Sequence, residues 1–223
     1  MSEKSTNKYA IVDLEATSAS STACIIQVGI VIMQNGRVID EFASDVNPHQ
    51  KLDNHIVHLT GITDQQLSQA PDFSEIARTI FELIEDCIFV AHNVKFDANL
   101  LAEALFMEGF ELRTPRVDTV ELAQVFYPTL EQYNLSYLSR VLNLDLAQAH
   151  TAIEDARATG KLLLHLMDKI ASLPRQTIDM LLTFSDNLLF ESELVIRDAI
   201  KGKTNSLSKE YIMLEESGIV LRR

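Results

Sequence analysis

The chain has 223 residues, of which 47% are hydrophobic and 23% are charged, proportions typical of a folded domain and not of a disordered chain. Its 19 lysine and arginine residues face 32 aspartate and glutamate residues, which gives a formal net charge of −13 at pH 7. This acidity excludes a protein that coats nucleic acid through a broad basic surface. No apolar stretch reaches the roughly 18 residues of a membrane span, and the N-terminus does not have the pattern of a secretory signal.

The two cysteines, Cys24 and Cys87, both lie in apolar runs and neither has a CxxC partner. A disulfide or zinc framework needs paired cysteines at short, regular spacings, and this chain has none. We therefore expect two buried thiols in a protein of a reducing compartment, the cytoplasm.

Hydrophobic patterning predicts a meander of three strands at the start of the chain. The apolar run over 9–15 reads as a buried strand that ends in two acids, and a second run covers 24–33. The pair Asn35-Gly36 is a strong hairpin signal because both residues tolerate positive φ. The alternating stretch over 37–46 then returns as the third strand.

Strands alternate with helices after the meander. We expect strands over 87–91 and near 117–118, short helical pieces over 53–58 and 64–69, and helices over about 72–86, 96–109, 119–126, 135–142, 152–171 and 176–189. This order predicts an α/β fold in which helices flank a mixed five-stranded sheet, with the three-strand meander followed by parallel strands.

Two carboxylates stand at the end of the first predicted strand. Asp13 and Glu15 are two residues apart, so their side chains share one face of that strand. A buried strand rarely carries two acids on one face unless a cation offsets their repulsion and desolvation. The alternative is that the strand ends earlier and that water solvates both acids.

Two further acids lie in predicted helices. Asp97 comes soon after the strand over 87–91, and open α/β sheets build their sites beyond the carboxyl ends of strands. Asp155 lies in the helix that follows His150, so the acid and the imidazole can converge on one water molecule. The alternatives are that Asp97 only favours a helix N-terminus and that Asp155 lies on a solvated helix face.

The three segments together resemble the DEDD exonuclease family, in the DnaQ-like subgroup whose third motif carries histidine. The resemblance covers about 8–171. The first motif, D-x-E followed by Thr, matches 13–17, the second matches 93–97, and the third, H-x-A-x-x-D, matches 150–155. Ala16 and Ser18 stand where the family more often has Thr and Gly. The resemblance implies a ribonuclease H-like fold and a 3′→5′ exonuclease, a phosphodiesterase that releases nucleoside 5′-monophosphates.

The family's catalytic residues map onto matching positions of this chain. The resemblance implies two divalent cations, Mg²⁺ or Mn²⁺, held by four carboxylates: Asp13, Glu15, Asp97 and Asp155. Hard oxygen ligands of this kind suit both metals. His150 is the implied general base, since an imidazole with a pKa near ~6.5 can accept a proton around neutral pH.

Substrate contacts are implied by the same resemblance. The expected contact residues lie just after the first motif, in the segment Leu59-Thr60-Gly61-Ile62 and within the second motif: Ala16, Thr17, Leu59, Thr60, Asn93 and Phe96. The expected partner is the 3′ end of a single-stranded nucleic acid, with DNA favoured. Two alternatives stay open. In the first, the substrate polymer is RNA and not DNA. In the second, the domain is a non-catalytic interaction module tethered to a helicase or polymerase.

The C-terminal segment over 172–223 differs in sequence pattern from the rest of the chain. We expect an exonuclease domain over 1–171 and a helical linker over 172–223, which is similar to the linker of DinG-type proteins, where a helicase domain follows. The alternative is an independent helical tail. No G-x-x-x-x-G-K-[ST] motif occurs, so an attached ATPase would lie beyond this chain.

Overall fold

The computed structural model of the chain describes residues 7–20, 22–144 and 151–201. Within these residues a five-stranded sheet has the order β3-β2-β1-β4-β5. The strands are β1 (Lys8–Ala16), β2 (Ile25–Gln34), β3 (Arg37–Asp45), β4 (Ile88–Ala91) and β5 (Arg116–Asp118). The first three strands pair antiparallel, and β4 and β5 add in parallel. The predicted mixed sheet is confirmed.

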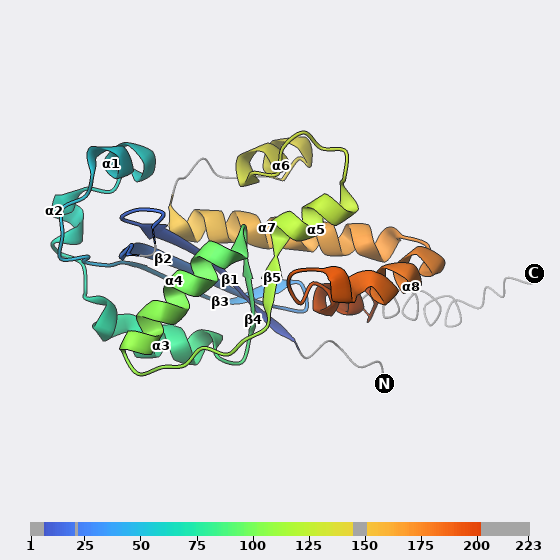
Figure 1. Ribbon diagram of the computed structural model, residues 1–223, viewed down its shortest axis with the longest axis horizontal. Helices are drawn as coiled ribbons and strands as arrows, with labels where there is room; N and C mark the ends of the chain where they lie inside the picture. Colours follow the sequence, from blue (N-terminus) through green and yellow to red (C-terminus); the bar gives the residue numbers. More distant parts are fainter. Residues whose placement is uncertain (1–6, 21, 145–150, 202–223) are drawn as a thin grey trace, which may run out of the picture.

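Helices cover both faces of this sheet (Figure 1). They are α1 (Asn54–Thr60), α2 (Asp64–Leu67), α3 (Phe73–Ile84), α4 (Val94–Met107), α5 (Thr119–Phe126), α6 (Leu135–Val141), α7 (Ala152–Ser172), α8 (Arg175–Phe184) with the 3₁₀ turn η1 (Ser185–Asn187), and a last helix over 193–201. In the described part of the chain, no helix has both the length and the apolar character needed to cross a membrane.

Helix α4 begins two residues earlier than its sequence pattern predicts. The reason is Asp118 at the end of β5, whose carboxylate accepts hydrogen bonds from the backbone N–H groups of Asn93 (3.0 Å) and Val94 (3.2 Å). The first N–H groups of a helix have no partner within the helix. A side chain from a distant strand therefore satisfies them and extends the helix toward β4.

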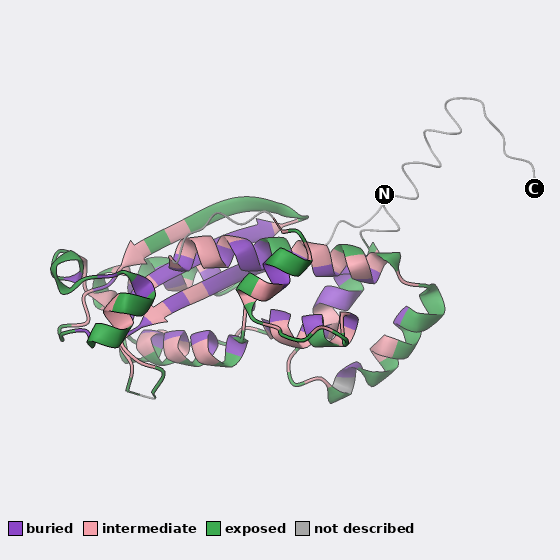
Figure 2. Cartoon of the chain, turned by 90° about the horizontal axis from the view of Figure 1, so that it is seen from above, coloured by how far each residue is buried: buried purple, intermediate pink, exposed green. Residues whose placement is uncertain are grey.

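The two faces of the sheet carry separate apolar cores, because alternate residues of a strand point to opposite sides. Ile11 of β1 belongs to the core under α5, α6 and α7, whereas Val12 belongs to the core under α3 and α4. Figure 2 shows buried residues concentrated in the sheet and in the inward faces of the helices. Cys87 is buried and Cys24 half-buried, and both are free thiols.

The described part of the C-terminal segment packs onto the core beneath α7. Ile178 of α8 and Val195 and Ile196 of the last helix are almost fully buried in that core. The backbone N–H of Glu191 donates to the carbonyl of Arg116 in β5, and the backbone N–H of Arg116 donates to the carboxylate of Glu191. Residues of this core therefore continue past the end of α7 as far as Ile200.

Candidate active site

The site begins where β1 extends beyond its pairing with β4. That pairing covers Tyr9 to Ile11, so the last residues of β1 lie past the end of β4. On the face that α7 covers, Asp13 and Glu15 continue the row begun by Tyr9 and Ile11. The strand does not end before the acids, and both are only partly exposed.

Helix α7 brings the third carboxylate to the same place. Asp155 lies in the first turn of α7, where its N–H donates to the carbonyl of the N-cap residue Thr151. One carboxylate oxygen from each of Asp13, Glu15 and Asp155 can be chosen so that all three lie within 4.8 Å of one another. Two acids of β1 and one acid from the distant helix α7 therefore form one acidic cluster.

Asp97 approaches from the opposite layer of helices. It lies in the first turn of α4 and is only 6% exposed. Its carboxylate accepts a hydrogen bond from the backbone N–H of Leu14 (3.0 Å), between the two acids of β1. This bond holds Asp97 at the edge of β1 beside the cluster, so the structure brings together all four acids that the sequence singles out.

The pKa shifts at this cluster reflect burial and mutual repulsion. Burial, followed by the charges of Asp97, Asp155 and Glu15, raises the pKa of Asp13 well above its usual range. Burial raises the pKa of Asp97 to about 7, although the hydrogen bond from Leu14 N–H acts in the opposite direction. A cation bound among these oxygens would relieve both causes.

The donor set fits a hard divalent cation. Three carboxylates converge within ligand distance of one another and the buried fourth adjoins them. Mg²⁺ and Mn²⁺ prefer carboxylate oxygen, and no thiolate or imidazole takes part in the described cluster. This chain can therefore hold a divalent metal at the carboxyl end of β1.

The histidine that follows β4 has a structural role. His92 donates from Nε2 to the carbonyl of Tyr133 (2.8 Å), and its Nδ1 lies 2.9 Å from the Thr119 hydroxyl. Burial lowers its pKa, so the ring stays neutral near pH 7. His92 thus links the end of β4 to the start of α5 and to the loop before α6. His150, the expected base, lies outside the described residues.

The expected substrate contacts on α1 differ in exposure. Leu59 is 61% exposed, whereas Thr60 is 9% exposed. The Thr60 hydroxyl donates to the carbonyl of Ile56 (2.9 Å) and accepts from the N–H of Ile62 (3.1 Å). Leu59 thus presents an apolar side chain to solvent, while the hydroxyl of Thr60 stabilises the end of α1.

The other expected contacts adjoin the acids. Ala16 is buried at the end of β1, and the Thr17 hydroxyl accepts from the N–H of Cys24 (3.0 Å), which closes the following loop. Asn93 is exposed in a left-handed conformation (φ 76°) at the start of α4, and Phe96 is half-buried in its first turn. These four residues flank Asp13 and Asp97 along the chain.

Three residues that contact the elements of the site have no role assigned from the sequence. Asp118 holds the start of α4, as described above, and it also caps α5 by accepting from Val120 N–H (2.8 Å). Gln27 and Gly29 of β2 contact the start of α7. The available signal was a polar residue and a glycine within the apolar run over 24–33, and an acid directly before a predicted helix.

Comparison with known proteins shows the family of this chain. A family model described as "Exonuclease" matches residues 10–163. The 3'-5' exonuclease DinG of Staphylococcus aureus (strain USA300) is 35% identical over 211 residues, which are 93% of this chain and 24% of that protein. The chain thus spans about a quarter of the length of this relative.

Solved structures share the fold. Exonuclease X in complex with 5' overhanging duplex DNA superposes with a TM-score of 0.59 at 20% identity, over 72% of this chain and 91% of that one. The nuclease domain of 3'hExo, a DEDDh family member bound to rAMP, gives 0.63 at 16% identity, over 74% and 94%. E. coli Exonuclease I in complex with a dT13 oligonucleotide gives 0.66 at 16% identity, over 80% and 44%.

The family model covers most of the chain, including the end of β1, the start of α4 and the first turn of α7. The acids that the structure gathers all lie within the matched residues. The chain therefore belongs to the exonuclease family.

Proposed function

We propose that this domain is a 3′→5′ exonuclease that hydrolyses phosphodiester bonds at the 3′ end of single-stranded DNA and releases nucleoside 5′-monophosphates. The observation that carries the proposal is the convergence of Asp13, Glu15 and Asp155, with Asp97 beside them, in a chain of the exonuclease family. The relative from S. aureus is named a 3'-5' exonuclease, and Exonuclease I was solved with an oligodeoxynucleotide.

The four carboxylates would hold two divalent cations, Mg²⁺ or Mn²⁺. When bound, such ions supply charge neutralisation for an attacking water and for the departing 3′ oxygen. The chain's own contribution is to hold the carboxylates close together, where their mutual repulsion would otherwise separate them. The backbone N–H of Leu14 does this for Asp97, and a hydrogen bond to a carboxylate also favours its charged form.

His150 is proposed as the general base that takes the proton from the attacking water. It precedes Asp155 by five residues in the sequence, and an unperturbed imidazole titrates near ~6.5. Replacing it, as in His150→Ala, should lower kcat by about 10²- to 10⁴-fold while metal binding persists. A variant that retains the wild-type rate near pH 7 would remove His150 from this role.

Substrate would be held locally, since the net charge of −13 does not favour a broad electrostatic surface. We propose Leu59 and Phe96 as apolar contacts for the terminal nucleotide, because stacking and apolar contacts accept any base. Asn93 and the backbone at Ala16 and Thr17 would contact the phosphate and sugar. Thr60 would act by holding Leu59 in place.

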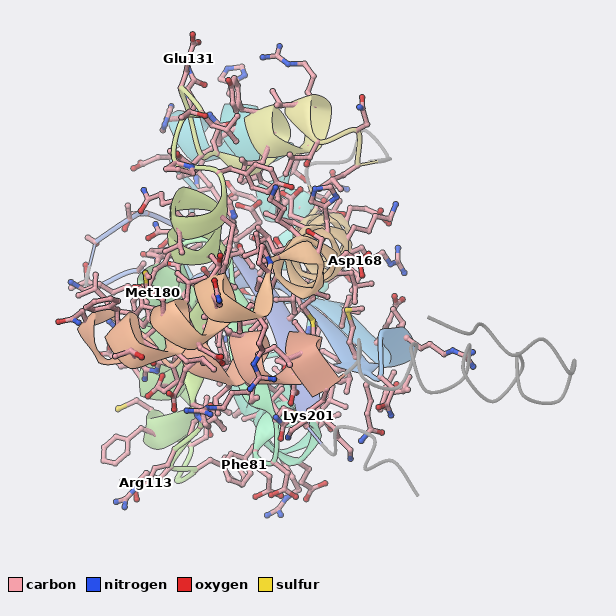
Figure 3. All side chains as sticks on the ribbon, turned by 90° about the vertical axis from the view of Figure 1, so that its right-hand side faces the viewer. Phe81, Arg113, Glu131, Asp168, Met180 and Lys201 are labelled. Carbon is pink, nitrogen blue, oxygen red and sulfur yellow. The ribbon has the colours of Figure 1, made fainter. Side chains whose placement is uncertain are left out.

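The decisive experiment compares acids of the cluster with a matched acid outside it. Asp13→Asn and Asp155→Asn should each abolish release of mononucleotides from a 3′-labelled oligonucleotide, and excess EDTA should do the same to the wild type. Asp168→Asn is the control, because Asp168 is exposed on the same helix as Asp155, far along α7 (Figure 3). Full activity in EDTA would contradict the metal mechanism.

The same assay measures the direction of digestion and the preference for DNA or RNA. Matched DNA and RNA strands labelled at the 3′ or the 5′ end should show that 3′-labelled DNA loses its label first, as a mononucleotide. Faster digestion of the RNA strands would instead select an RNA-directed enzyme. An attached helicase domain is proposed as context, since the chain spans 24% of the DinG relative, and cleavage by the longer protein is measured in the same way.

A further inference from the structure

The start of helix α7 is capped by a side chain of the sheet. The N-cap residue Thr151 is extended and makes no side-chain capping bond. Instead, the backbone N–H of Ala152 donates to Oε1 of Gln27 on β2 (2.8 Å), 125 residues earlier in the chain. The first N–H groups of a helix lack partners within it. This bond therefore satisfies one of them and fixes the start of α7 to Gln27 on the sheet.

A second contact lies two residues along β2. A Cβ atom on Gly29 would lie 2.2 Å from the carbonyl carbon of Ala152 and 2.3 Å from the backbone N of Ile153. The first turn of α7 therefore rests directly on the strand backbone. In the β1–β2 pairing, Gly29 lies opposite Asp13 and Gln27 lies opposite Glu15. The two contacts thus stand across from the two acids that Asp155 must meet.

The orientation of the Gln27 amide is set by its other partner. Its Nε2 donates to Oδ1 of Asp45 (2.7 Å), and the Nε2 of Gln66 donates to Oδ2 of the same carboxylate (2.7 Å). A carboxylate only accepts, so the amide nitrogen of Gln27 must face Asp45 and its oxygen must face α7. A chain of hydrogen bonds runs from α2 through β3 and β2 to Ala152.

We infer that Gln27 is a positioning residue for Asp155: held by Asp45, it caps α7 and so places the Asp155 carboxylate against Asp13 and Glu15. The inference rests on the proposed nuclease function for its kinetic consequences. The placement itself is a property of the metal-free chain. Partners that orient metal ligands in this way typically change metal affinity or activity by about 10- to 100-fold.

The first test is Gln27→Leu, which removes the cap at similar side-chain volume. It should weaken Mn²⁺ binding, measured by calorimetry, and lower kcat, each by about 10- to 100-fold, while KM for the oligonucleotide stays within about twofold. With both proteins metal-free, hydrogen exchange at the Ala152 amide should be faster in the variant than in the wild type. Gln66→Leu is the matched control, because it removes the outer, exposed donor and leaves the bond to Ala152 intact.

The second test is a rescue that distinguishes positioning from general destabilisation. Gln27→Glu alone places a carboxylate against Asp45 and should lower kcat. The pair Gln27→Glu with Asp45→Asn keeps the total charge and reverses donor and acceptor: the new amide at position 45 donates to the new carboxylate at position 27, and the amide oxygen accepts from Gln66. The double variant should recover kcat and Mn²⁺ affinity toward wild-type values.

Each outcome decides between specific alternatives. If Gln27→Leu keeps wild-type Mn²⁺ affinity, kcat and Ala152 exchange, the inference is wrong. It is equally wrong if Gln27→Leu does not fold and the double variant folds but recovers neither kcat nor affinity. If the wild type itself neither binds Mn²⁺ nor cleaves DNA, the proposed function fails, and Ala152 exchange in the variants still decides whether Gln27 positions α7.

Discussion

Among single residues, Asp97 shows how a buried acid can be kept close to other acids. Its side chain is almost inaccessible to water, and its carboxylate accepts from the N–H of Leu14. That bond offsets only part of the desolvation, so the pKa of Asp97 rises to about 7. In the metal-free protein, the acid holds its proton more tightly when folded than when unfolded, which makes stability depend on pH.

The direction of that dependence can be measured with Asp97→Asn. Because the pKa of Asp97 is higher in the folded than in the unfolded protein, the unfolding free energy falls as pH rises from about 4 to about 7. In EDTA, the wild type should therefore lose on the order of 2–4 kcal/mol relative to Asp97→Asn across this window. Asparagine retains the acceptor for Leu14 N–H. Urea denaturation at a series of pH values measures both proteins. If their unfolding free energies change in parallel with pH, the prediction is wrong.

Divalent metal should reverse this loss in the wild type. A ligand that binds the folded protein stabilises it in proportion to the logarithm of its concentration above Kd, and deprotonated carboxylates bind cations best. Mn²⁺ should therefore raise the Tm of the wild type more at pH 8 than at pH 5. A Tm that does not respond to Mn²⁺ at either pH would count against a metal site at Asp13, Glu15 and Asp155.

Among the elements, α7 matters most for the site because it carries Asp155 and covers β1 and β2. Two glycines lie at this interface. Gly29 faces the backbone of α7, whereas a Cβ on Gly160 of α7 would meet the sulfur of Met33 at 3.0 Å. A flexible thioether can move aside, but the backbone of a helix start cannot move without moving Asp155.

A pair of glycine replacements should separate these two cases. Gly29→Ala should displace the first turn of α7 and cost about 3 kcal/mol or more of unfolding free energy, with loss of nuclease activity. Gly160→Ala should be close to neutral, because alanine gains up to about 1 kcal/mol of helix propensity that offsets the tight contact. Urea denaturation measures both variants. Equal stabilities would show that α7 does not depend on the bare backbone at Gly29.

For the molecule as a whole, the C-terminal segment is held by buried and paired carboxylates. Asp198 of the last helix accepts from the Tyr9 hydroxyl at the start of β1 (2.7 Å), and burial beside Asp198 raises the pKa of Tyr9. Glu121 of α5 accepts from the Ser192 hydroxyl (2.6 Å). Figure 3 looks onto this part of the molecule, with α8 and the last helix in the foreground and with Met180 and Lys201 labelled.

This packing predicts one cooperative unit up to residue 201. Ile196→Ala should lower the unfolding free energy by about 2–4 kcal/mol, because Ile196 is 1% exposed in the core beneath α7. Met180→Ala is the control, since Met180 is 62% exposed on α8 and should change stability by less than about 0.5 kcal/mol. Two separate unfolding transitions would show instead that the segment after residue 171 is an independent linker.

The sequence by itself determined the kinds and order of elements and the residue types of the site. Strand alternation placed Asp13 and Glu15 on one face, and helix signals placed Asp97 and Asp155 in first turns. These are local properties, because the periods of strands and helices and the caps of helices depend on residues a few positions apart.

Only the tertiary structure decided how these parts meet. The bond from Leu14 to Asp97, the cap of α7 by Gln27 and the contact of Gly29 with Ala152 all join segments that lie far apart in the chain. No local pattern encodes them, because they depend on strand register and on how closely a helix can approach the sheet. The acids of the site were therefore readable in the sequence, and the residues that hold them together were not.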